Sequence, residues 1–210
     1  METWPLLSLL VWLPILGGLA VLATGESRPQ QARVFGIAIA LATFLLSLPL
    51  YAGFDTGNAA MQFVERASWI PAIDSWYHLG ADGISVALIL LTTFCTVLVL
   101  LGAWEAIEDR VHQYVACFLV LEGLMVGVFC AMDALLFYVF FEAMLIPMFI
   151  IIGIWGGPRR VYATIKFFIY TFFGSIFMLV GLIYLYMKGG SWALSDLAAM
   201  PLSATEQMWL

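Results

Sequence analysis

Three ionisable residues lie inside long apolar runs of the sequence: Glu122, Glu142 and Lys166. A charge at the centre of a bilayer costs at least about 2.5–3.5 kcal/mol, so such residues are rare unless they serve a function such as transport. Burial disfavours the charged form of a carboxyl group and moves its proton exchange toward neutral pH. Two acids and a lysine in consecutive apolar runs therefore predict the binding and release of protons within a membrane. A purely structural scaffold leaves these three residues unexplained.

Glu142 has the most informative context of the three. If its apolar run is helical, Glu142 lies about 12 Å from the start of that helix, close to mid-membrane. Tyr138 lies one turn earlier and offers a hydroxyl donor, and Pro147 lacks the N–H that would bond to the carbonyl of Ala143. A kink beside a buried acid leaves room for water. We expect Glu142 to titrate, and the alternative is a structural acid that stays protonated and hydrogen-bonded.

Glu122 and Lys166 each allow a functional and a structural interpretation. Glu122 lies near the middle of its run beside Gly123 and Gly127, whose spacing favours close helix packing. It is either a second proton-relay acid or a packing acid. Lys166 lies near the start of its run. Either its long side chain snorkels to the interface or pairs with Glu142, which are structural roles, or it lines an aqueous path.

The composition requires a membrane environment for these residues. The chain has 210 residues, of which 64% are hydrophobic and 10% charged, against about 45–50% and about 25% in soluble domains. A bilayer core of about 30 Å needs about 20 apolar residues of helix, because lipid offers no partner to unpaired backbone groups. We predict an all-α polytopic membrane protein, one transmembrane domain over 1–210, with six helices at about 4–24, 34–53, 83–104, 111–132, 134–156 and 161–187.

The predicted connections are polar, and the longest is a loop over 54–82. Lys and Arg favour the cytoplasmic side of a membrane. The even-numbered connections and the tail carry only Arg66 and Lys188, whereas the odd-numbered connections carry Arg28, Arg33, Arg110, Arg159 and Arg160. This asymmetry predicts a multi-pass protein whose odd-numbered connections face the cytoplasm and whose N-terminus faces the periplasm or its equivalent.

Other classes of chemistry lack their motifs in this sequence. It has no Gly-rich phosphate loop, no nucleophile triad, no Cys/His spacing typical of a metal site and no basic patch for nucleic acid. Cys95, Cys117 and Cys130 all lie in apolar runs, which argues against a disulfide framework. We therefore expect no cofactor, metal or nucleic acid on this chain.

The run VGVFCAMDALLFYVFFEAMLIPM at 126–148 resembles chain M of the proton-translocating NADH:quinone oxidoreductase, respiratory complex I. Three further segments resemble the same family: IWGG at 154–157, ATIKFFIYT at 163–171 and LGADGIS at 79–85. An acid, a proline and Trp-Gly-Gly at these spacings form a specific combination.

The resemblance implies an antiporter-like fold and a membrane-arm subunit that translocates protons, coupled to electron transfer from NADH to quinone. It implies that Glu142 is the helix-five glutamate of the family, whose partner lysine on helix seven would lie beyond Leu210. The sequence is then expected to be an N-terminal portion, from a truncated or partial reading frame. Lipid and the other membrane-arm subunits are the expected partners, and NAD, FMN, iron–sulfur clusters and quinone are expected in partner subunits. The alternative is a subunit of a multi-chain sodium/proton antiporter without redox chemistry, which shares this glutamate.

Overall fold

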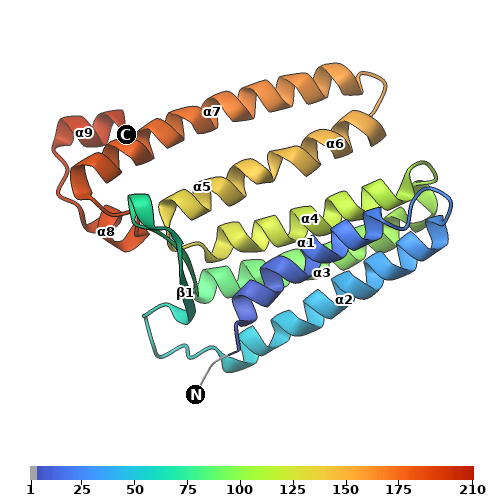
Figure 1. Ribbon diagram of the computed structural model, residues 1–210, viewed down its shortest axis with the longest axis horizontal. Coiled ribbons are helices and arrows are strands. Elements are labelled where there is room, and N and C mark those ends of the chain that lie inside the picture. Colours follow the sequence, from blue (N-terminus) through green and yellow to red (C-terminus); the bar gives the residue numbers. More distant parts are fainter. Residues whose placement is uncertain (1–3) are drawn as a thin grey trace.

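The computed structural model describes residues 4–210. Its long helices run side by side along the longest axis, with a strand hairpin and two short helices at one end (Figure 1). Within residues 4–210, five spans are long and apolar enough to cross a bilayer, one of them Ala134–Trp155, and Leu6–Leu22 is a shorter apolar helix of 17 residues. The helices are α1 (Leu6–Leu22), α2 (Pro29–Gly53), α3 (Gly83–Ala106), α4 (Val111–Cys130), α5 (Ala134–Ala143), α6 (Leu145–Trp155), α7 (Arg160–Gly189), α8 (Leu194–Ala199) and α9 (Ala204–Trp209).

The stretch 54–82 is not the loop that its polarity predicts. It contains an antiparallel hairpin of β1 (Gln62–Ile70) and β2 (Ser75–Ala81), joined by a 3-10 turn at Pro71–Ile73. The chain reverses at Asp74, which has a left-handed backbone with φ of 52°, a conformation that Asp tolerates better than most residues. The aromatic and β-branched residues of the stretch favour strands, although its charges suggested a loop.

Two helices also differ from their predicted bounds. Helix α2 begins at Pro29, five residues before the predicted start, because proline is well suited to the first turn of a helix. It therefore includes Arg33, whose guanidinium donates to the carbonyl of Ile107 at 2.8 Å. The single helix predicted over 134–156 is interrupted at Met144, between α5 and α6.

Helix α4 lies at the centre of the bundle and contacts α1, α2, α3, α5 and α6. Two glycines on α4 make this close packing possible. A Cβ at Gly123 would collide with the backbone carbonyl of Val11 on α1, and a Cβ at Gly127 would collide with the ring of Phe140 on α5. The close helix packing that this glycine pair predicts is present, and it fixes which face of α4 turns toward each neighbour.

The two ends of the bundle differ in their chemistry. At one end, which we call the hairpin end, lie β1, β2, the connection 131–133 and the segment 190–194. At the other, the arginine end, a cavity of about 640 Å³ is bordered by Glu26 and Arg110 from two connections and by Arg160, the first residue of α7. Trp155 also donates there to the carbonyl of Asp109 at 3.0 Å. The connections predicted to carry most of the arginines therefore lie together.

Candidate functional site

Glu142 lies in the last turn of α5, two residues before the break at Met144. Pro147, buried in the first turn of α6, offers no N–H to the carbonyl of Ala143. The Glu142 side chain is half-buried, and its Oε1 is buried without a hydrogen-bond partner among residues 4–210. The structure thus places an acid beside an interrupted helix, in the span where the sequence predicts one.

The neighbours of Glu142 are aromatic and hydroxylic. Tyr138, one turn earlier on α5, lies near the carboxyl group of Glu142 and the hydroxyl of Ser175 on α7. Phe137 and Phe141 stack with ring centroids 6.0 Å apart. Helix α5 contacts both α4 and α7. Tyr138 therefore offers a hydroxyl group near Glu142 at the boundary between α5 and α7.

Glu122 is more deeply buried than Glu142. Its side chain is 1% exposed, and neither carboxylate oxygen has a hydrogen-bond partner among the described residues. It lies on α4, opposite the hydroxyl-bearing face of α3. A buried acid without partners is costly, so its local packing alone does not explain it.

Lys166 is separate from both acids. Its side chain is exposed on α7, and its Nζ lies 5.7 Å from the ring centroid of Tyr162. It borders a groove of about 680 Å³ with Arg159 and Arg160 at the arginine end. Within residues 4–210 the ion pair formed is Lys188–Glu206, so the structure does not bring Lys166 together with Glu142.

Asp133, which the sequence marks only as a turn, organises the hairpin end. Its carboxylate is 2% exposed and accepts hydrogen bonds from the backbone N–H groups of Leu135 and Leu136, both at 3.0 Å, so that it caps α5. On β2, it also accepts from the backbone N–H of Trp76 at 3.0 Å and from the hydroxyl of Ser75 at 3.2 Å. One carboxylate therefore ties the start of the Glu142 helix to the hairpin.

The backbone around Asp133 makes further contacts across the hairpin end. The Met132 N–H donates to the backbone carbonyl of His78 on β2 at 2.9 Å, and the Ala134 N–H donates to the backbone carbonyl of Trp192 at 2.8 Å. Trp192 in turn donates through its indole N–H to the carbonyl of Ile73 at 3.1 Å. Burial and the charge of Arg66 lower the pKa of His78, which favours its neutral form. The hairpin thus connects α5 to the segment that follows α7.

A carboxylate on the hairpin, that of Glu65 on β1, caps α1. Glu65 accepts from the backbone N–H groups of Leu7 at 2.7 Å and Ser8 at 3.1 Å, and also from the Ser8 hydroxyl. These N–H groups have no partner within the helix, and a negative charge at a helix N-terminus is favourable. Burial raises the pKa of Tyr77, whose hydroxyl lies 3.1 Å from that of Ser8.

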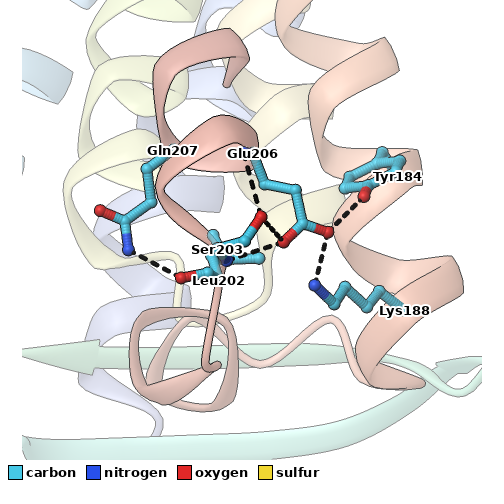
Figure 2. Close-up of polar contacts among 6 residues, drawn as sticks. All are labelled: Tyr184, Lys188, Leu202, Ser203, Glu206 and Gln207. Carbon is cyan, nitrogen blue, oxygen red and sulfur yellow. Dashed lines mark hydrogen bonds and ion pairs between the residues drawn. The ribbon is translucent and has the colours of Figure 1, made fainter.

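Glu206 fastens α9 to the end of α7, as Figure 2 shows. Its Oε1 accepts from Lys188 Nζ at 2.5 Å and from the Tyr184 hydroxyl at 2.6 Å, and its Oε2 accepts from the Ser203 N–H and hydroxyl at 2.7 Å. The Lys188 ammonium group, followed by Tyr184 and Ser203, lowers the pKa of Glu206. Ser203 and Glu206 complete a capping box.

Comparison with known proteins identifies the family. Residues 131–210, which include Glu142 and Lys166, match the family model described as NADH:quinone oxidoreductase/Mrp antiporter, TM. NADH-quinone oxidoreductase subunit M of Rhodobacter capsulatus is 50% identical over 191 residues, which are 89% of this chain and 36% of that protein. The chain belongs to this family. NADH-ubiquinone oxidoreductase chain 4 of Arabidopsis thaliana is 42% identical, over 97% of this chain and 41% of that protein.

Solved structures of the family share the arrangement of these helices. A chain of respiratory complex I from Thermus thermophilus with bound NADH superposes with a TM-score of 0.83 at 30% identity, covering 97% of this chain and 41% of that chain. The Mrp complex from Dietzia gives a TM-score of 0.80 at 16% identity, over 97% of this chain and 22% of that chain, which shows a shared fold. The all-α, polytopic, antiporter-like fold class is confirmed. The chain spans about two fifths of the length of the subunit M and chain 4 relatives.

Proposed function

We propose that this chain acts within a membrane-arm subunit of a proton-translocating NADH:quinone oxidoreductase, and that Glu142 binds and releases the translocated proton. The observation that carries this proposal is the position of Glu142: a half-buried acid, two residues before the interruption of its helix, with one carboxylate oxygen that has no hydrogen-bond partner among residues 4–210. The relatedness to subunit M proteins supports the same assignment.

The chemistry required of Glu142 is electrostatic. A positive charge that approaches a carboxyl group stabilises the anion and drives the proton off, and each tenfold change in proton affinity corresponds to about 1.4 kcal/mol. Pro147 offers no N–H to the carbonyl of Ala143, the residue after Glu142, so this carbonyl can accept a hydrogen bond from water beside the acid.

Electron transfer belongs to other chains in this proposal. NAD, FMN, iron–sulfur clusters and quinone are bound by partner subunits, and the other membrane-arm subunits are the neighbours of this chain. Among residues 4–210 no group of three or more His, Cys, Asp and Glu lies together as a metal site. This chain supplies the proton path, with Glu122 as a second proton-binding acid and Lys166 at the cytoplasmic entrance.

The distribution of arginines supports one orientation in a bacterial inner membrane. The arginine end brings Arg33, Arg110 and Arg160 together, and the hairpin end carries Arg66 and Lys188. By the positive-inside rule the arginine end faces the cytoplasm, and the N-terminus and the hairpin face the periplasm.

Energised membrane vesicles test the reaction class. Inverted vesicles that contain the full-length protein in its complex are given NADH without sodium, or a sodium gradient without NADH, and proton movement is followed with a pH-sensitive dye. We expect NADH to drive proton uptake that an NADH-site inhibitor abolishes, and the sodium gradient to drive none. Proton movement driven by sodium alone would instead assign the chain to a sodium/proton antiporter, the function that its shared fold with the Mrp complex leaves as the second candidate.

A further inference from the structure

A cavity of about 140 Å³ lies between α3 and α4, and Glu122 forms part of its wall. Its lining comes from two helical stripes with spacings of three and four residues, which therefore face each other. The stripe on α3 contributes Thr92, Cys95, Thr96 and Val99, and the stripe on α4 contributes Phe118, Leu121, Glu122 and Met125. The lining is mostly apolar, and Glu122, Thr92 and Thr96 are its oxygen-bearing side chains.

Glu122 is the one acid that borders this cavity, and its surroundings leave it unpaired. Both of its carboxylate oxygens are buried without a partner among residues 4–210, and no cation of that part of the chain lies within 4 Å of them. Thr92 and Thr96 are both buried on the opposite wall. The Thr96 hydroxyl donates to the carbonyl of Thr92 at 3.0 Å, so its oxygen retains lone pairs that accept a further hydrogen bond.

The orientation of Glu122 toward α3 is fixed by packing on the other faces of α4. Gly123 lies against the backbone of Val11, and Gly127 lies against Phe140. A rotation of α4 that moved Glu122 out of the cavity would break both close contacts. These two contacts therefore hold Glu122 on the face of α4 that borders the cavity.

We propose that the α3–α4 cavity is a proton-binding site that admits water, in which Glu122 is protonated and exchanges its proton with that water. A volume of about 140 Å³ has room for water at about 30 Å³ per molecule, and a water beside Glu122 finds the two or more polar partners that it needs in the carboxyl group and in Thr92 and Thr96. The role of this site, a store of protons beside the Glu142 path, rests on the proposed function. The site itself does not.

Infrared spectroscopy of the full-length protein in its complex tests the site. The carbonyl stretch of a protonated carboxyl group is recorded in H₂O and after transfer to D₂O, for the wild type, Glu122→Gln and Glu142→Gln. We expect a band that is present in the wild type and in Glu142→Gln, is absent in Glu122→Gln, and shifts in D₂O within seconds. A Glu122 band that stays unshifted for hours would show a dry site, and the absence of any such band would show an ionised acid; either result overturns the proposal.

Thr96→Val provides a second, nearly isosteric variant that keeps Glu122. Because it removes one hydrogen-bonding group from the cavity, we expect exchange of the Glu122 band to slow by about tenfold, the equivalent of one hydrogen bond. Thr43→Val, at a buried threonine of α2 whose hydroxyl bonds to its own helix at 2.9 Å, is the matched control and leaves the rate unchanged. Equal rates in all three proteins would contradict a hydrated cavity, even if Glu122→Gln fails to accumulate.

The two proposals fail separately. Unchanged proton pumping in Glu142→Gln together with an exchanging Glu122 band would overturn the proposed function and leave the site. Lost pumping in Glu142→Gln together with an unshifted Glu122 band would overturn the site and leave the proposed function.

Discussion

Glu122 and Glu142 stand at the same depth on neighbouring helices. Glu122 precedes Cys130, the last residue of α4, by eight positions, and Glu142 follows Ala134, the first residue of α5, by eight. At 1.5 Å per residue both lie about 12 Å from the hairpin end. The connection 131–133 therefore sets the depth of both acids, and the hydrogen bonds of Asp133 hold this connection against the hairpin.

Replacement of Asp133 by Ala should destabilise the hairpin end. The variant leaves the N–H groups of Leu136 and Trp76 without their buried acceptor, which should cost about 3 kcal/mol, within the range for charged hydrogen bonds. Thermal unfolding in detergent measures the loss. Asp196→Ala, at an exposed acid of α8, is the control and should change stability by less than about 0.5 kcal/mol. Equal stabilities of the two variants would show that Asp133 does not hold the hairpin to α5.

Much of the bundle follows from the sequence alone. Long apolar runs predict the spans, because lipid requires internally bonded helices, and Pro147 predicts a kink near Glu142, although not the interruption at Met144. The distribution of arginines also predicts which connections meet at one end. Each of these signals is local: it depends on residue type and on spacing within one element.

The polar contacts at the hairpin end do not follow from local signals. Asp133 binds Trp76 across 57 positions, and Glu65 caps a helix 58 positions earlier. Nothing within a few residues of either acid marks its partner. The sequence predicts a loop where β1 and β2 lie, because charged residues interrupt the apolar alternation typical of strands. The aromatic residues of this stretch are the feature that favours strands.

Glu65→Gln should loosen the start of α1. The amide keeps one acceptor but loses the charge that favours the helix N-terminus, at a cost of about 1 kcal/mol. Hydrogen exchange of the Leu7 and Ser8 amides, which bond to Glu65, should accelerate correspondingly. Glu108→Gln, at an exposed acid of the arginine end, is the control and should leave these amides protected. If both variants exchange like the wild type, the Glu65 charge does not stabilise α1.

Gly123→Ala should separate α1 from α4. The added Cβ meets the backbone carbonyl of Val11, which cannot move as a side chain can, and we expect a loss of about 2 kcal/mol in unfolding free energy. Gly174→Ala makes the same change on α7, where no atom lies within 4 Å of the new Cβ, and should be neutral or stabilising. The two variants are compared by thermal unfolding. A neutral Gly123→Ala would contradict the close packing of these helices.

Acidification should weaken the hairpin through His78. Its pKa is lowered in the folded chain by burial and by Arg66, so the native state binds fewer protons than the unfolded state. Stability is therefore complete above the unfolded pKa of about 6.5 and is lost as the pH falls below it. Hydrogen-exchange protection factors of Ser75–Ala81 between pH 7.5 and 5 measure this loss. His78→Gln should flatten the profile, whereas His112→Gln should leave it unchanged; a flat wild-type profile would contradict the effect.

The most direct measurement of the central claim is the number of protons translocated per NADH by the Glu142→Gln variant of the full-length protein in its complex. The account predicts that NADH oxidation continues while this ratio falls clearly below that of the wild type, and that Glu142→Asp, which restores a titratable carboxyl group, recovers part of the loss. A ratio equal to that of the wild type in Glu142→Gln would contradict the assignment of Glu142 as the proton carrier.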